Sequence, residues 1–138
     1  MSRAHTELHY HLVWSTWGRH PFLEEQHQES LYRHVISKCR EYGYDLHAVN
    51  GGSDHMHVAL RLKPTVSVSE AARKLKGSAS RFCNRELHLE TVFRWQGGYG
   101  ALTFGTRDLP KVVAYVRAQK ERHRSQRLDE TLEAIGEG

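Results

Sequence analysis

The chain has 138 residues, of which 38% are hydrophobic and 26% are charged, so we expect one soluble globular domain over residues 1–138. No apolar run could span a membrane and the polar N-terminus lacks a secretory signal, which predicts a cytoplasmic protein. The formal net charge is only +4, and the cysteines Cys39 and Cys83 are too far apart for a close metal-binding spacing. We expect them to be reduced thiols in helices.

The first predicted elements are a strand and a helix. Apolar and polar residues alternate over residues 5–15, which indicates a half-buried strand. A turn follows near Pro21, and residues 24–42 then form a predicted amphipathic helix that Gly43 ends. Its apolar stripe is Leu31, Val35, Cys39 and Tyr42.

Two further strands are predicted over residues 44–49 and 55–62, before Pro64. Asn50-Gly51-Gly52 joins them, and we expect it to supply the positive φ angles of a tight connection. One face of the later strand carries Met56, Val58, Leu60 and Leu62, and the other carries His55, His57, Ala59 and Arg61. The histidine face is expected to look outward or toward the last helix.

The second half of the chain predicts a helix, a strand and a final helix. Residues 69–86 are amphipathic, with Ser67 or Ser69 as the cap. Their buried stripe is Ala72, Leu75, Ala79 and Phe82. An aromatic, glycine-rich stretch over residues 93–104 predicts a fourth strand from about Tyr99. Pro110 falls in the first turn of the last helix, whose face includes Val112, Tyr115, Val116 and Gln119. The acidic tail, residues 128–138, is expected to be a short helix or frayed.

This order of elements, β-α-β-β-α-β, is typical of the split βαβ, ferredoxin-like fold of the α+β class. We therefore expect a four-stranded antiparallel sheet with the two main helices on one face. A C-terminal helix that bears Tyr115 is added to this sandwich.

Basic residues are concentrated in two segments, which suits binding to a polyanion because each phosphate contact releases counterions. The first segment contains Arg73, Lys74, Lys76, Arg81 and Arg85, and the second contains Arg117, Lys120, Arg122, Arg124 and Arg127. Taken alone, such clusters are more often a solvated face.

His55 and His57 are the first candidates for a metal site. The strand period places both imidazoles on one side, about 7 Å apart at the Cα atoms, so both could converge on one ion. Asp54 could orient one ring through its second nitrogen. The spacing alone is weak evidence, because His9 and His11 share it.

Tyr115 and Gln119 lie one helical turn apart on the same face. A glutamine oxygen can complete a hard-metal site beside two imidazoles, while a tyrosine hydroxyl projects toward the bound ligand. The competing interpretation, which this helix alone favours, makes Tyr115 a core residue together with Val112 and Val116.

Several motifs together carry a resemblance to a known family. They are Tyr10-His11-Leu12-Val13-Trp14-Ser15-Thr16, Asp54-His55-Met56-His57, Leu75-Lys76-Gly77 with Ser80-Arg81, Trp95-Gln96 with Gly98-Tyr99-Gly100, and Tyr115-Val116-Arg117-Ala118-Gln119. In this order they resemble the HUH transposases of the insertion sequence 200/605 type and their REP-associated tyrosine transposase relatives. The resemblance runs from about Tyr10 to His123.

The resemblance implies a role for each matching residue. His55, His57 and Gln119 would bind a divalent metal, Mg²⁺ or Mn²⁺, and Tyr115 would be the nucleophile. Cleavage and rejoining of single-stranded DNA would pass through a 5′-phosphotyrosine link without a nucleotide cofactor. The substrate would be single-stranded DNA that carries hairpins, and the protein would be a homodimer. The basic helix from Arg73 to Arg85 is our choice for phosphate contacts, together with Arg117 and Lys120. Trp95 and Tyr99 could stack on bases or lie in the core.

Three alternatives stay open from the sequence. The chain could be a domesticated, non-mobile nucleic-acid-binding module with the same fold. It could be another HUH endonuclease, such as a replication initiator or a relaxase. It could also be a metal-dependent phosphohydrolase, which would release free 5′ ends rather than form a covalent adduct.

Overall fold

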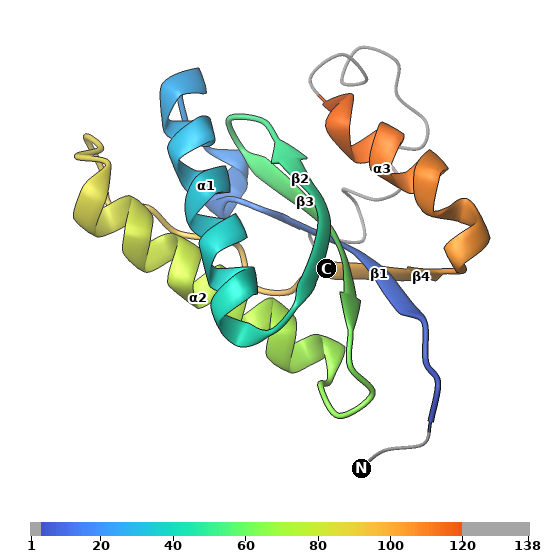
Figure 1. The fold of residues 1–138 in the computed structure, drawn as a ribbon. Coiled ribbons are helices and arrows are strands. Elements are labelled where there is room, and N and C mark those ends of the chain that lie inside the picture. Colours follow the sequence, from blue (N-terminus) through green and yellow to red (C-terminus); the bar gives the residue numbers. More distant parts are fainter. Residues whose placement is uncertain (1–3, 120–138) are drawn as a thin grey trace.

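The computed structural model describes residues 4–119, and Figure 1 shows the order β-α-β-β-α-β followed by a last helix. The strands are β1 (Leu8–Ser15), β2 (Asp45–Gly51), β3 (His55–Leu62) and β4 (Gly100–Phe104). The helices are α1 (Glu25–Tyr42), α2 (Val68–Glu86) and α3 (Leu109–Arg117), with short 3-10 turns η1 (Trp17–Arg19) and η2 (Thr106–Asp108). The predicted tail, residues 128–138, lies outside the described residues.

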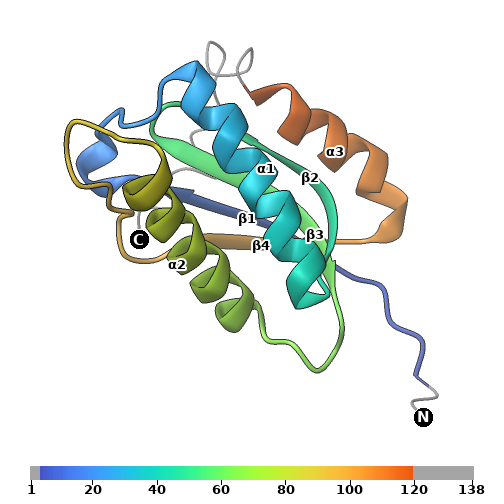
Figure 2. The ribbon, with the colours of Figure 1, turned by 60° about the vertical axis from the view of Figure 1, so that its left-hand side comes forward.

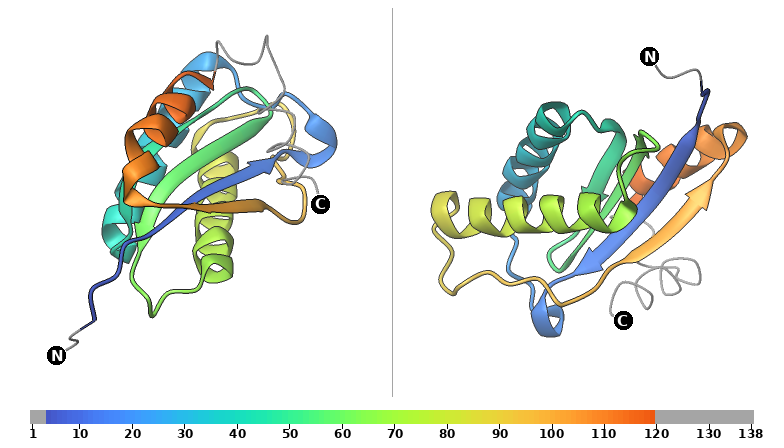
Figure 3. Two further views of the ribbon diagram at one scale, coloured as in Figure 1. Left: turned by 90° about the vertical axis from the view of Figure 1, so that its right-hand side faces the viewer. Right: turned by 90° about the horizontal axis from the view of Figure 1, so that it is seen from below.

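The four strands form one sheet in the order β2-β3-β1-β4, and every neighbouring pair is antiparallel. Helices α1 and α2 lie together on one face of this sheet (Figure 2), and α3 lies on the opposite face (Figure 3). The ferredoxin-like α+β fold predicted from the sequence is thereby confirmed, including the additional C-terminal helix.

The boundaries of the elements follow from local chemistry. Gly43 ends α1 because it adopts a left-handed conformation, with φ of 78°, in which its N–H reaches the last turn of the helix. Of the two predicted caps of α2, Ser67 is the one used, since its hydroxyl accepts a hydrogen bond from the Glu70 N–H at 3.1 Å. Within residues 4–119, no helix is long and apolar enough to cross a membrane.

The sequence predicted that the glycines between β2 and β3 supply positive φ angles, and this prediction was wrong. Gly51 does not have a positive φ; it is the last residue of β2 and pairs with Met56. A Cβ atom at Gly51 would lie 2.2 Å from the carbonyl oxygen of His55 and 2.9 Å from the Cα of Met56. Glycine is therefore required by the close approach of two backbones.

The main core lies between the sheet and helices α1 and α2. It contains Leu12, Trp14, Met56, Val58 and Leu60 from the sheet, Leu31, Val35 and Cys39 from α1, and Leu75, Ala79 and Cys83 from α2. Both cysteines are reduced thiols in helices, as predicted. Phe82, predicted in the buried stripe of α2, is only partly buried and stacks on His34 instead.

A second, smaller core lies between the other face of the sheet and α3, where Val13, Ala48, Ala59, Tyr115 and Val116 pack together. Because α3 covers this face, β1 is buried on both sides over most of its length, and the prediction of a half-buried strand was wrong. The strand also begins at Leu8 rather than His5, since its partner β3 ends at Leu62.

Candidate functional site

His55 and His57 both point to the α3 face of β3 and are almost completely buried, with 1% and 0% of their surface exposed. Their ring centroids are 5.2 Å apart and their planes are nearly perpendicular. The sequence left this face either outward or toward the last helix; the structure shows that it faces α3. Burial of two imidazoles under a helix is costly unless their nitrogens are bonded, so each ring must be supported by its neighbours.

Each of the two rings is held through its Nδ1 atom. The Nδ1 of His55 lies 2.9 Å from a carboxylate oxygen of Asp54, and the Nδ1 of His57 lies 2.9 Å from the Nε2 of His11. A histidine that donates through Nδ1 coordinates a metal through Nε2. Asp54 thus occupies the supporting position that the sequence suggested, whereas the contact of His11 was not anticipated.

Asp54 is itself held by Arg19, whose Nε donates to the second carboxylate oxygen at 3.1 Å. Partial burial alone would raise the pKa of Asp54, but the hydrogen bond with His55 and the charge of Arg19 outweigh it and lower this pKa to about 2. Arg19 has a φ of 58°, which is unusual for a residue other than glycine. Two hydrogen bonds thus link these side chains in series, from Arg19 to Asp54 and from Asp54 to His55.

Helix α3 packs over the histidine pair. The Tyr115 ring packs edge-on against His57, at 5.9 Å between centroids, and against His11, at 5.6 Å. Tyr115 also belongs to the small core, which agrees with the core interpretation of this residue; its role as nucleophile stays a prediction.

Gln119, which follows α3, is fully buried. Its amide nitrogen donates to the carbonyl oxygen of Tyr115 at 3.3 Å, so the amide oxygen is the branch directed away from the helix. Asn50 of β2 donates to the Arg117 carbonyl at 2.8 Å and so ties the end of α3 to the sheet. These contacts fix the position of Gln119 and of the end of α3 relative to the sheet.

The donor chemistry of this site fits a divalent ion with two nitrogen ligands and one amide oxygen. Within the part of the chain that the structure describes, no three His, Cys, Asp or Glu side chains are grouped to hold a metal. Gln119, whose amide is buried, is a described residue of another type that could supply a third ligand. A carbonyl oxygen suits Mg²⁺ or Mn²⁺, whereas imidazole is also a good ligand for Zn²⁺, Fe²⁺ and Ni²⁺.

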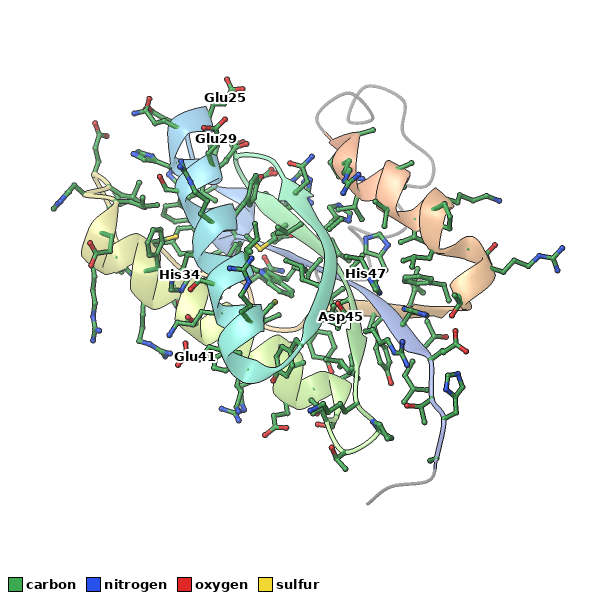
Figure 4. The ribbon with its side chains drawn as sticks, in the orientation of Figure 1. Glu25, Glu29, His34, Glu41, Asp45 and His47 are labelled. Carbon is green, nitrogen blue, oxygen red and sulfur yellow. The ribbon has the colours of Figure 1, made fainter. Side chains whose placement is uncertain are left out.

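His11 is buried, and burial lowers the pKa of its ring to about 4, so it is neutral at pH 7. Its neighbour on the same strand face, His9, belongs to a separate network. The Nδ1 of His9 lies 2.9 Å from the Nε2 of His47, and its Nε2 lies 2.8 Å from the Thr106 hydroxyl. His47 lies on the side of the sheet that carries α3 (Figure 4).

Three of the predicted DNA-contacting residues lie in one row on α2, since the spacing of Lys74, Arg81 and Arg85 repeats on one helical face. Arg81 and Arg85 line a groove of about 350 Å³ together with His34 and Lys38 of α1. His34 lies between α1 and α2, on the side away from α3 (Figure 4). Glu86 also lines this groove and Lys38 pairs with Glu41 at 2.9 Å, so Arg81 and Arg85 carry most of its free positive charge, on the face of the molecule opposite Tyr115.

The other predicted DNA-contacting residues are placed differently. The Lys76 ammonium donates to the carbonyls of Gln96 and Gly98, at 2.8 and 2.7 Å, and so holds the loop before β4. Trp95 in this loop packs on Trp14 and Phe93 and donates to the Lys76 carbonyl, which makes it a core residue. The remaining predicted residues are Arg73, exposed on α2, Arg117, exposed at the end of α3, and Lys120, which lies outside the described residues.

A ferredoxin-like sheet with a buried histidine pair facing a helix-borne tyrosine defines the kind of site to be matched with known proteins. The model of the family described as "Transposase IS200 like" matches residues 4–119. The chain belongs to this family of transposases. The resemblance drawn from the ordered motifs is thereby confirmed.

Individual relatives agree with this assignment. The ISDra2 transposase TnpA of Deinococcus radiodurans is 22% identical over 121 residues, which cover 84% of this chain and 86% of that protein. A crystal structure of a protein described as a transposase, from Deinococcus radiodurans R1, superposes with a TM-score of 0.66 at 23% identity, covering 86% of this chain and 95% of that one. A REP-associated tyrosine transposase bound to a REP hairpin superposes with a TM-score of 0.65 at 17% identity, covering 89% of this chain and 73% of that one.

Proposed function

We propose that this transposase is a metal-dependent enzyme that cuts and rejoins single-stranded DNA through Tyr115. The observation that carries the proposal is the packing of the Tyr115 ring against His57, with the amide of Gln119 one turn further along the chain. Helix α3 thus places the proposed nucleophile against the proposed histidine ligands of β3.

His55, His57 and Gln119 are the proposed ligands of the ion, Mg²⁺ or Mn²⁺. When bound, the ion would offset the charge of the scissile phosphate and polarise it. Asp54 and Arg19 orient the ring of His55, and Asn50 anchors the end of α3. Because α3 covers the histidines, the DNA backbone would have to reach them along the side of this helix.

The proposed chemical step is a transesterification at phosphorus. The phenolic oxygen of Tyr115 forms a bond to phosphorus while the bond from phosphorus to the 3′-oxygen breaks. The phenol gives up a proton and the 3′-oxygen takes one up, which yields a 5′-phosphotyrosine link and a free 3′-hydroxyl. Attack of a 3′-hydroxyl on the same phosphorus reverses the step and joins the strands. One ester replaces another, so no nucleotide is consumed.

The proposed substrate is single-stranded DNA that carries a hairpin. A neighbour with the same fold is described as bound to a REP hairpin. In this chain the groove between α1 and α2, with Lys38, Arg81 and Arg85, is the proposed contact for hairpin phosphates. The groove and Tyr115 lie on opposite faces of the sheet, so the strand between hairpin and cut must pass an edge of the sheet. A flexible single strand can do this and a stiff duplex cannot.

We also propose a homodimer in which a second copy adds to an edge of the sheet. In the described residues β2 and β4 are the two edge strands, and each has a row of backbone groups available for pairing.

A covalent adduct tests the function directly. The full chain is incubated with Mn²⁺ and a hairpin-bearing single strand, and the product is run on a denaturing gel. We expect a protein–DNA adduct that Tyr115→Phe abolishes. Tyr10→Phe is the matched control, because Tyr10 packs toward the main core rather than toward the site.

Other outcomes would contradict the proposal in distinguishable ways. Cleavage without an adduct would indicate a phosphohydrolase, and binding without cleavage under any metal would indicate a non-catalytic module. An adduct that persists in Tyr115→Phe would show that another residue is the nucleophile.

A further inference from the structure

His11 lies behind His57 on the neighbouring strand. The antiparallel register of β1 and β3 pairs Val13 with His57 and His11 with Ala59, so the two histidines lie diagonally on the same face. Their facing nitrogens are 2.9 Å apart, and their ring centroids are 5.1 Å apart. Both side chains are buried, which limits competition from water for this hydrogen bond.

The direction of this hydrogen bond decides whether His57 can bind a metal. If His57 donates from Nδ1, its Nε2 has a lone pair for coordination. If His57 accepts at Nδ1, the proton is on Nε2, and this nitrogen cannot be a ligand. The first arrangement requires His11 to accept at Nε2, which places the proton of its own ring on Nδ1.

We propose that His11 is a positioning residue that holds His57 in the tautomer and ring orientation required to bind the metal ion. The inference rests on the proposed function, which makes His57 a ligand. His11 is not a further ligand, because its Nε2 meets the Nδ1 of His57, the nitrogen on the side away from the proposed ion.

The two proposed histidine ligands are therefore supported in different ways. A carboxylate contacts the Nδ1 of His55, and an imidazole contacts the Nδ1 of His57. A carboxylate partner adds negative charge to a metal site, whereas a neutral ring fixes orientation without changing the charge. The same His11 ring touches Tyr115, so it also sets the spacing between the proposed ligand and the proposed nucleophile.

The experiment measures Mn²⁺ affinity of the full chain by calorimetry, without DNA. His11→Leu is expected to weaken binding by about 10- to 100-fold, the usual effect of losing a partner of a metal ligand. His11→Gln is expected to restore Kd to within about threefold of the wild type, because its amide oxygen can accept at the place of Nε2.

His9→Leu is the matched control. His9 is on the same strand and face, is also buried and also bonds to a histidine, but its partners are His47 and Thr106. We expect the His9→Leu variant to bind Mn²⁺ as tightly as the wild type. Equal affinities of His11→Leu and His9→Leu would overturn the inference, because the loss of any buried histidine would then have the same effect.

A second measurement does not depend on the variants. Nitrogen-15 NMR of the metal-free wild type reports the tautomer of His57, and we expect the proton on Nδ1; a proton on Nε2 would overturn the inference even if His11→Leu fails to fold. Wild-type protein that binds no Mn²⁺ would refute the metal site in the proposed function. Wild-type binding that His11→Leu leaves undiminished refutes only the role of His11.

Discussion

Replacement of Gly51 by alanine tests how the structure positions the proposed metal ligands. The new Cβ would lie 2.2 Å from the His55 carbonyl oxygen, 2.9 Å from the Met56 Cα and 3.1 Å from the His55 carbonyl carbon. All three atoms are backbone, so no side chain can turn away. The two strands must separate by about 1 Å to reach ordinary contact distance, because atoms in a packed interior tolerate little overlap.

This separation would weaken the pairing that ends β2 and begins β3. The pair Gly51 and Met56 would be disturbed, as would the 3.1 Å hydrogen bond from the Gly52 N–H to the His55 carbonyl. Two weakened backbone hydrogen bonds and the residual strain together cost about 2–4 kcal/mol. For a protein of this size that lowers Tm by about 8–16 °C. His55 would shift with its backbone, so Mn²⁺ affinity should fall as well.

Thermal unfolding followed by circular dichroism measures the first effect, and calorimetry with Mn²⁺ measures the second. Gly105→Ala is the control, since a Cβ there meets no atom within 4 Å and its φ of −83° suits any residue. We expect this control to change stability by less than about 1 kcal/mol. If Gly51→Ala were as stable as Gly105→Ala and bound Mn²⁺ as tightly as the wild type, the steric argument would be refuted.

Two further predictions concern buried and exposed charges. Burial raises the pKa of the Cys39 and Cys83 thiols to about 12, so iodoacetamide should modify neither in native protein at pH 8 and both in guanidinium; rapid native labelling would contradict this. Because these pKa values are raised in the folded state, their stabilising contribution is present below about pH 9 and is lost as the pH rises toward 12. Arg81→Gln should weaken hairpin binding and reduce its salt slope by about 1, as fluorescence anisotropy would show. An unchanged salt slope for Arg81→Gln would exclude Arg81 as a phosphate contact. Lys76→Gln should keep the wild-type slope but cost about 1–3 kcal/mol of stability, because two carbonyls lose their ammonium donor.

The sequence alone determined the fold and the faces of its elements. A period of two over residues 55–62 assigns His55 and His57 to the face opposite Met56, and the structure agrees. Helical spacing places Gln119 one turn from Tyr115. These properties are local, since the backbone of a strand or helix fixes which side chains share a face wherever the element packs. The reason for glycine at Gly51 was missed because that reason is the carbonyl of another strand.

Spacing and burial did not separate the two histidine pairs; the family resemblance pointed to His55 and His57, and only the tertiary structure showed the contacts of each pair. His9 and His11 have the same spacing and the same burial as His55 and His57, and nothing local distinguishes them. The register between β1 and β3 places His11 against His57, whereas His9 meets His47 and Thr106. A shift of register by two residues would keep every sequence pattern and exchange these partners.

The supporting residues of the site were likewise decided by tertiary contacts. Arg19 lies in the short turn η1, whose sequence gives no sign of the Asp54 carboxylate that it meets. Lys76 lies in a basic segment yet binds two carbonyls of a loop. Sequence patterns report which face a residue occupies, because that depends on neighbours along the chain. They do not report which group on another segment a side chain will contact, because a hydrogen bond forms over about 3 Å between segments that only the packed fold brings together.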